Sequence, residues 1–194
     1  MNFPNVRSDA SAVRPTTAGG TLLAERPAIT ADQFKFAFRN HPGGVAVITA
    51  DAGDGPVGLT ATSVISANVE PNILAFSVSE SSSSTPTIRS SDTVVVHLIS
   101  AEQVHIAKLC ATSGIDRFAD TSLWSRLETG EPYFPSAKAW IRGRIVNSMA
   151  AGESAIVAVE ALQASPLLSG DALPGKPLVY HNRCWHALAD ASQI

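Results

Sequence analysis

Hydrophobic and β-branched residues gather in short runs along this chain, and turn-forming residues separate the runs. The segments GVAVITA (44–50) and VGLTATS (57–63) enclose the turn-rich DAGDGP, a pattern that predicts a β-hairpin. Further strands are expected in the other runs of this kind: NILAFSV, TVVVHLIS, AWIRGRIVNSM, SAIVAVEALQA and PLVYHNRCWHAL. Because most of these runs are joined by turns, the pattern predicts a mainly β fold, a closed barrel with a few short helices.

Two helices are expected to begin at capping boxes, in which a Ser or Thr is followed three residues later by Glu or Gln. Thr30 and Gln33 have this spacing at the start of TADQFKFAF. Ser100 and Gln103 have it again at the start of residues 101–111. Helices and strands do not alternate regularly, which disfavours a Rossmann domain.

The chain is expected to form one domain preceded by an arm. Residues 1–29 are rich in Ser, Thr, Gly, Ala and Pro without periodicity, which predicts a mobile N-terminal arm; an arm that wraps around a partner is the alternative. Residues 30–190 are expected to form the domain, since a chain of 194 residues can bury one substantial core.

Composition narrows the choice of partners and compartment. A formal charge of −3 without a basic run argues against nucleic acid and anionic membranes as main partners. Only 16% of residues are charged, which favours a homodimer that covers weakly charged surface. No apolar run approaches the about 18 residues that span a bilayer, and the first residues lack the pattern of a secretory signal. We expect a cytoplasmic protein with its two cysteines reduced.

The ionisable residues form no familiar catalytic or metal-binding pattern. His181 and His186 lie five positions apart, where side chains of one strand point to opposite faces, so no metal site is expected. His97 lies among valines and is expected to be a hydrogen-bonded core or interface histidine. Glu128 and Glu131 flank a Thr-Gly turn, where solvated carboxylates are expected.

Two hydroxyl-rich segments are candidates for ligand binding. SESSSSTPTIRSS (79–91) combines hydroxyls, the start of a short helix and Arg89, which together suit a phosphate; a polar low-complexity loop is the alternative. In GLTATS, an extended strand places Thr60 and Thr62 on one face and Ala61 and Ser63 on the other. Their side chains therefore cannot all contact one ligand, but the strand end could border a flat heterocycle. A plain strand end is the alternative.

The order of the segments resembles that of the short-chain flavin reductases, which serve two-component flavin-dependent monooxygenases. The resemblance covers residues 31–188. It rests on six motifs in order: HPGGVAVIT, GPVGLTATSVISANVEPNILAFSV, SESSSSTPTI, VVVHL, DRFAD and PLVYHNRCWHAL. It implies a split β-barrel that binds FMN or FAD, commonly as a homodimer. It also implies that NADH or NADPH reduces the flavin, which then passes to a separate oxygenase.

The resemblance also implies a set of site residues. Those expected to border the isoalloxazine are Thr60, Ala61, Thr62, Ser63, Ser66, Ala67 and Asn68, and those expected to hold the phosphate are Ser82, Ser83, Ser84 and Arg89. Those expected on the nicotinamide side are Phe118, Ser154, Tyr180 and His181, with core packing as the alternative for Phe118 and for the Tyr-His pair. No catalytic side chain is expected, because hydride passes directly between the two cofactors.

One position departs from the family pattern. Many relatives have Gly-Asp-His where this chain has Gly152-Glu153-Ser154, and their histidine lies beside the nicotinamide. Serine can form hydrogen bonds but can neither carry charge nor stack. A flavin-binding or flavin-carrier protein without productive nicotinamide turnover is therefore the alternative function. A split-barrel oxidase or haem-handling relative is disfavoured, since no haem-ligand context is evident.

Overall fold

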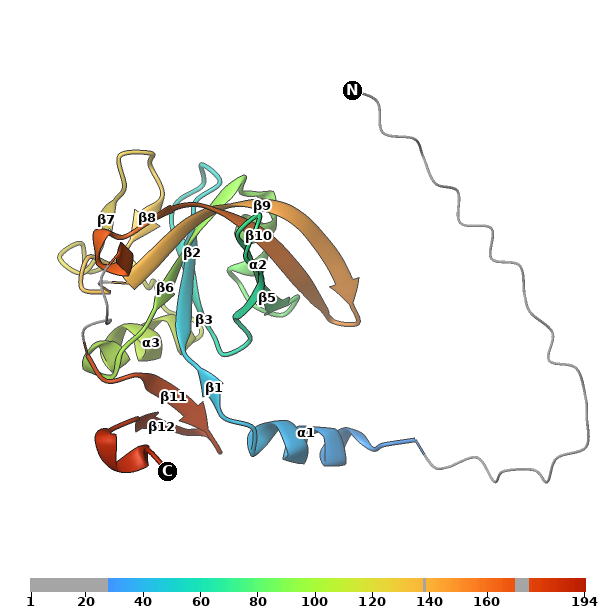
Figure 1. Cartoon of the computed structure of the whole chain (residues 1–194). Coiled ribbons are helices and arrows are strands. Elements are labelled where there is room, and N and C mark those ends of the chain that lie inside the picture. Colours follow the sequence, from blue (N-terminus) through green and yellow to red (C-terminus); the bar gives the residue numbers. More distant parts are fainter. Residues whose placement is uncertain (1–27, 138, 170–174) are drawn as a thin grey trace, which may run out of the picture.

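A curled, seven-stranded antiparallel sheet forms the body of the molecule in the computed structural model, which describes residues 28–137, 139–169 and 175–194 (Figure 1). In spatial order its strands are β3 (Val57–Ala61), β2 (Ala46–Ala50), β6 (Thr93–Leu98), β9 (Ala139–Ala151), β10 (Ser154–Ala164), β5 (Ile73–Ser79) and β4 (Ile65–Asn68). The mainly β prediction is confirmed. Residues 1–27 of the predicted arm lie outside the described residues.

Strand β2 explains why its segment is apolar throughout. All five of its residues are buried, because the sheet is covered on both faces. Ala46 and Ile48 point into the curl of the sheet, in a core shared with Phe76. Val47 points to the opposite face, in a second core that includes Ile106 of helix α3 (Val104–Ala111). The continuous β-branched run therefore marks the strand shared by two cores.

The remaining elements surround this sheet. The other helices are α1 (Ala31–Arg39), α2 (Thr85–Ser90), η1 (Ala101–Gln103), η2 (Pro166–Ser169) and η3 (Asp190–Ser192). The other strands form two small sheets: β1 (Gly43–Gly44) with β11 (Leu178–His181) and β12 (Cys184–Ala187), and β7 (Ser125–Arg126) with β8 (Pro132–Tyr133). Both predicted capping boxes are present. Within the described residues, no helix has the length and apolar character that crossing a membrane requires.

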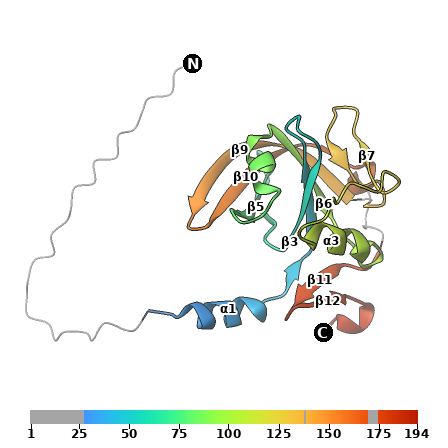
Figure 2. The same cartoon turned by 180° about the vertical axis from the view of Figure 1, so that it is seen from behind.

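Helix α1 stands apart from the sheet. In Figures 1 and 2 it extends from β1 away from the curled strands, and none of its residues is buried. Phe34, Phe36 and Phe38 are 53%, 66% and 59% exposed. Its C-terminal end is anchored, since the amide of Asn182 donates to the carbonyl of Arg39 at 2.9 Å.

The last apolar run is a hairpin, not the single strand assumed for His181 and His186. Asn182 and Arg183 form its turn with φ of 46° and 65°, and the two imidazole rings lie 5.8 Å apart. The prediction that these rings point to opposite faces of one strand was therefore wrong. Within the described ranges, no three His, Cys, Asp or Glu side chains converge as a metal site would require.

Candidate functional site

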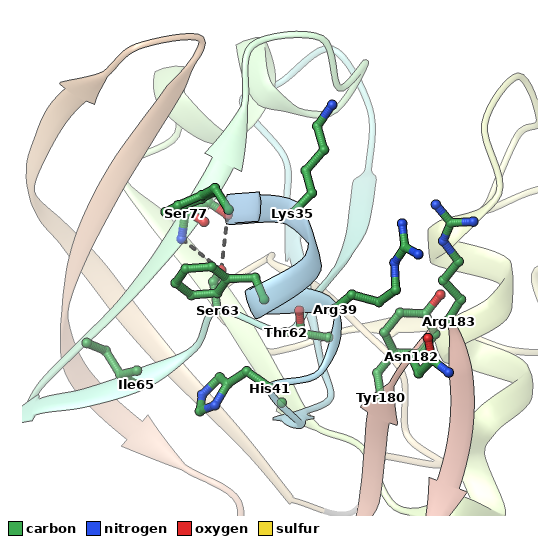
Figure 3. Close-up of a pocket in the computed structure, with 13 residues that line it drawn as sticks. Lys35, Arg39, His41, Thr62, Ser63, Ile65, Ser77, Tyr180, Asn182 and Arg183 are labelled. Atoms are coloured by element: carbon green, nitrogen blue, oxygen red, sulfur yellow. Dashed lines mark hydrogen bonds between the residues drawn. The ribbon is translucent and has the colours of Figure 1, made fainter. Parts of the chain in front are cut away.

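Three adjoining cavities follow the end of strand β3. The α1 cavity, of about 710 Å³, lies between α1, the strand end and the β11–β12 turn (Figure 3). The strand-end cavity, of about 330 Å³, lies between β3, β5 and the start of β10. The serine cavity, of about 390 Å³, lies between β3, the end of α3 and residues 79–85, which we call the serine loop. Residues common to the first two are Thr62, Ser63 and Ser77, and those common to the last two are Leu59, Thr60 and Ser82. The three cavities therefore adjoin one another along the strand end, and we call this row of cavities the groove.

The small side chains at the end of β3 have separate roles. The hydroxyl of Thr60 donates to the carbonyl of Ala107 in α3 at 2.6 Å, whereas Ala61 is buried in the core inside the curl. The predicted alternation is confirmed for this pair. Thr62 follows the strand and is exposed, and the Ser63 hydroxyl accepts from the Ser77 amide at 3.0 Å. Only Thr62 and Ser63 thus remain at the groove surface beyond the strand.

Glycine at position 43 allows this strand end to pack closely on β1. A Cβ atom at Gly43 would lie 2.9 Å from the carbonyl oxygen of Thr62, which is closer than real Cβ contacts. Any larger residue would displace Thr62. The groove wall is therefore built from backbone and small side chains held in a fixed position.

Ser154 reaches the same wall through strand pairing. It lies opposite Ser79 in the β10–β5 ladder and lines the strand-end cavity. By contrast, Ser66 and Asn68 lie on edge strand β4 and line another cavity of about 590 Å³, which shares Ile65 with the α1 cavity, and Ala67 between them is exposed. The structure thus brings Ser154 to the cavity that Thr62 and Ser63 line, whereas Ser66 and Asn68 line a different cavity.

The serine loop uses most of its own backbone donors. The amides of Ser81, Ser82, Ser84 and Thr85 each form hydrogen bonds within the loop. In this described stretch, only the amide of Ser83 forms none. The Ser84 side chain is buried, with 1% of the residue exposed, and its hydroxyl donates to the carbonyl of Gly58 at 2.9 Å. Ser84 therefore holds the loop in place, and Ser82 and Ser83 line the cavity.

Arg117 is the guanidinium that faces these serines. Its Nη1 atom lies 3.5 Å from the hydroxyl of Ser83 and 3.3 Å from that of Ser84, and its buried Nε atom has no hydrogen-bond partner in the described part of the chain. Arg89 instead forms an exposed ion pair with Glu80 at 2.7 Å. Sequence reasoning missed Arg117, although it lies in the DRFAD motif beside Phe118. A guanidinium beside the exposed hydroxyl of Ser83 suits an anion.

The nicotinamide-side candidates separate into two groups. Phe118 is 6% exposed and packs in the second core against Phe134, with ring centroids 5.6 Å apart. Tyr180 lines the α1 cavity and contacts Trp185, with centroids 4.8 Å apart. His181 is half-buried beside His186. Core packing thus accounts for Phe118, while Tyr180 is available to a ligand.

His97 is a structural histidine, as predicted. It is fully buried; its Nδ1 donates to the carbonyl of Val47 at 3.0 Å and its Nε2 accepts from the amide of Phe134 at 3.1 Å. These bonds require one neutral tautomer. Burial lowers the pKa of His97 to about 4, only partly opposed by the Val47 bond. Cys110 is also unreactive, because burial raises the pKa of its thiol to about 12.

The prediction that Glu131 is a solvated carboxylate was wrong. It is 6% exposed, and its Oε1 accepts from Thr93 and from Nε of Arg142, both at 2.6 Å. Burial raises its pKa, but hydrogen bonds from Thr129, Thr93 and Arg142 outweigh burial and leave the pKa lowered. This carboxylate is part of the interior and lies outside the groove.

Comparisons with known proteins found similar sequences. The sequence profile described as "Flavin reductase like domain" matches residues 38–189. A protein of Rhodococcus qingshengii named "NADH:FMN oxidoreductase" is 38% identical over 153 residues, covering 79% of each chain.

Solved structures give the same result for the fold. A flavin reductase domain protein from Arthrobacter sp. FB24 aligns with a TM-score of 0.75 and 29% identity, covering 82% of this chain and 96% of that chain. The flavin reductase component of a bacterial two-component tryptophan halogenase aligns with a TM-score of 0.72 and 25% identity, covering 83% and 99%. The predicted split-barrel fold is confirmed.

Proposed function

Because the chain belongs to the flavin reductase like domain family, we propose that it is an NAD(P)H:flavin oxidoreductase that supplies reduced FMN or FAD to a separate flavin-dependent oxygenase. The similarity to a protein named as an NADH:FMN oxidoreductase supports the reaction. The likeness to the reductase component of a two-component halogenase supports the transfer of reduced flavin to a partner.

The observation that carries the proposal is the pair of adjoining cavities that extends from Arg117 to Thr62. A flavin mononucleotide has an anionic phosphate at one end and a flat heterocycle at the other. The serine cavity offers the guanidinium of Arg117 and the hydroxyl of Ser83 for the phosphate. The strand-end cavity offers the backbone and small side chains of Thr62 and Ser63 for the ring.

The role of the side chains in this groove would be to bind the flavin and to orient it. When bound, the flavin supplies the hydride-accepting chemistry. Arg117 would hold the phosphate end, and the backbone and small side chains at Thr62 would border the ring. Ser154 borders this wall without charge. No ionisable side chain is needed as an acid or base at the ring.

We also propose that the protein is a cytoplasmic homodimer, in a compartment where reduced nicotinamide coenzymes are available. Large apolar side chains are exposed on strands β4, β9 and β10 of one sheet and in the turn after β4: Ile65, Val146, Met149, Ile156, Leu162 and Val69. Such a concentration favours coverage by a second copy. Sedimentation at micromolar concentration tests this, and a monomer would refute it.

Anaerobic mixing tests the reaction. Purified protein is mixed with FMN or FAD and then with NADH or NADPH, and loss of the oxidised-flavin absorbance is followed. We expect bleaching with at least one coenzyme. Tight flavin binding without bleaching by either coenzyme would instead support the flavin-carrier alternative that Ser154 suggested.

A further inference from the structure

Among the residues that the structure describes, three cationic side chains and no carboxylate line the α1 cavity. Lys35 and Arg39 come from α1, and Arg183 comes from the β11–β12 turn (Figure 3). The ion pairs among the described residues involve other arginines, so these three cations have no anionic partner. In a chain with a net charge of −3, this is a local concentration of positive charge.

The backbone holds these cations together. The Asn182 amide donates to the Arg39 carbonyl at 2.9 Å, which joins the hairpin turn to the end of α1. Arg183 follows Asn182 in that turn, with a left-handed φ of 65°. Lys35 lies four residues before Arg39 and therefore on the same side of the helix. In Figure 3 the side chains of Arg39 and Arg183 extend in the same direction. Like charges placed together repel, and a bound anion would remove that repulsion.

The cavity also offers surfaces for aromatic rings. Phe34 and Phe38 line it, with ring centroids 4.7 Å apart, and both are more than half exposed. Exposed aromatic faces suit a stacked base. Thr62 and Ser63 connect the cavity to the proposed ring wall. Its volume of about 710 Å³ is within the range of ligand sites.

We propose that Lys35, Arg39 and Arg183 bind the pyrophosphate of a dinucleotide, with its adenine against Phe34 and Phe38. This inference rests on the proposed function, because it assigns the coenzyme side of the same groove. Arginine binds phosphate oxygens through paired N–H donors, which suits a pyrophosphate held by two guanidiniums. This anion site lies at the opposite end of the groove from Arg117. The dinucleotide is NADH or NADPH, or else the adenosine half of FAD, since all three contain this chemistry.

Direct binding tests the cluster without any redox step. The probe is ADP-ribose, which contains the pyrophosphate and adenine but no reacting ring, measured by calorimetry. The variant is Arg39→Gln with Arg183→Gln, and its matched control is Lys108→Gln with Arg144→Gln, which removes two exposed cations outside the cavity. We expect the Kd to rise about tenfold in the first variant and to stay unchanged in the control. Equal Kd values in all three proteins would overturn the proposal.

Lys35→Gln gives a second measure that does not disturb the helix end. It removes one exposed charge, and we expect a smaller rise in Kd, together with a weaker salt dependence than in the unchanged protein. If the double variant does not fold, the Kd of Lys35→Gln for ADP-ribose tests the proposal alone. A Kd equal to that of the unchanged protein would then overturn the proposal.

Kinetics identify which dinucleotide is bound. With FMN as acceptor, the Arg39→Gln, Arg183→Gln variant is assayed with NADH and with reduced nicotinamide mononucleotide, which lacks the pyrophosphate. A KM that rises about tenfold for NADH alone assigns the site to the coenzyme. A selective loss of FAD over FMN assigns it to the flavin. An equal rise in KM for NADH and for reduced nicotinamide mononucleotide would overturn the proposal. If the unchanged protein reduces no flavin, the proposed function is refuted. In that case ADP-ribose binding still tests whether Lys35, Arg39 and Arg183 bind a pyrophosphate.

Discussion

The Nη1 atom of Arg117 lies 3.3 Å from the hydroxyl oxygen of Ser84, although 33 positions separate the two residues. The same hydroxyl donates to the carbonyl of Gly58 in β3. One buried serine therefore joins the DRFAD loop, the serine loop and the strand that leads to the ring wall. The position of the proposed phosphate site depends on this junction.

Replacing Arg117 tests the phosphate end of the groove. Arg117→Gln removes the guanidinium beside Ser83, so we expect the KM for FMN to rise at least about tenfold. Riboflavin, which lacks the phosphate, serves as the comparison and should show an unchanged KM. Arg144→Gln is the control for loss of an exposed charge. Arg89→Gln tests the guanidinium that the sequence favoured, and a larger effect there than at Arg117 would contradict this assignment.

The Ser84 junction predicts an effect on stability. Ser84→Ala removes the buried donor to the carbonyl of Gly58, and we expect a loss of about 1 kcal/mol in the free energy of unfolding. Ser83→Ala, at an exposed position in the same loop, should change it by less than about 0.5 kcal/mol. Urea denaturation of both variants measures the difference. Equal losses of unfolding free energy in the two variants would show that the buried hydrogen bond contributes no more than the exposed Ser83 hydroxyl.

His97 predicts how stability depends on pH. Its pKa falls from an ordinary value of 6.5 to about 4 in the folded protein, so folding favours the neutral ring. Its contribution is complete above pH 6.5 and is lost as the pH falls toward 4, because the unfolded chain then binds the proton first. We expect a slope of at most about 1.4 kcal/mol per pH unit in that window.

Denaturation between pH 4 and pH 7 measures this slope, and His105→Gln is the control. His105 is exposed on α3, so its loss should leave the slope unchanged. In His97→Gln the slope should flatten, even though the variant is less stable at every pH. An unaltered slope in His97→Gln would assign the pH dependence to another group.

Ser154 predicts a gain of activity. Ser154→His introduces a ring that can stack and carry charge at the wall of the strand-end cavity, and we expect a several-fold rise in turnover with NADH or NADPH. Stopped-flow reduction of FMN measures it. Ser148→His, on the exposed part of β9, is the control for an added histidine. An unchanged rate would mean that position 154 does not contact the nicotinamide.

The sequence predicts those parts of the fold that local patterns determine. The run in β2 is apolar because both faces are covered, and the capping boxes at Thr30 and Ser100 depend on residues only three positions away. Strand β4 was missed because its four residues are exposed and show no alternation. The β11–β12 turn was missed because Asn182-Arg183 lacks the glycine that marks such turns.

The site is less predictable because tertiary contacts assemble it. The segments around Thr62 and Ser82 were identified from their hydroxyls and from the resemblance, and both border the groove. Arg117 was not, since only the closed fold brings it to Ser83. Arg89 has the closer sequence position but pairs with Glu80. A charged residue that is close to a motif in the sequence is therefore a weaker indication of a binding site than a charged residue that the folded chain brings next to the motif.

The bond between Asn182 and Arg39 has a consequence for how the protein acquires its binding site. It joins helix α1 to the β11–β12 hairpin, so the α1 cavity has one wall from each end of the described part of the chain. The residues that line the serine cavity all precede β11 in the sequence, whereas the α1 cavity is complete only when that hairpin has paired with β1. During synthesis, every residue of the serine cavity is therefore made before the last wall of the α1 cavity.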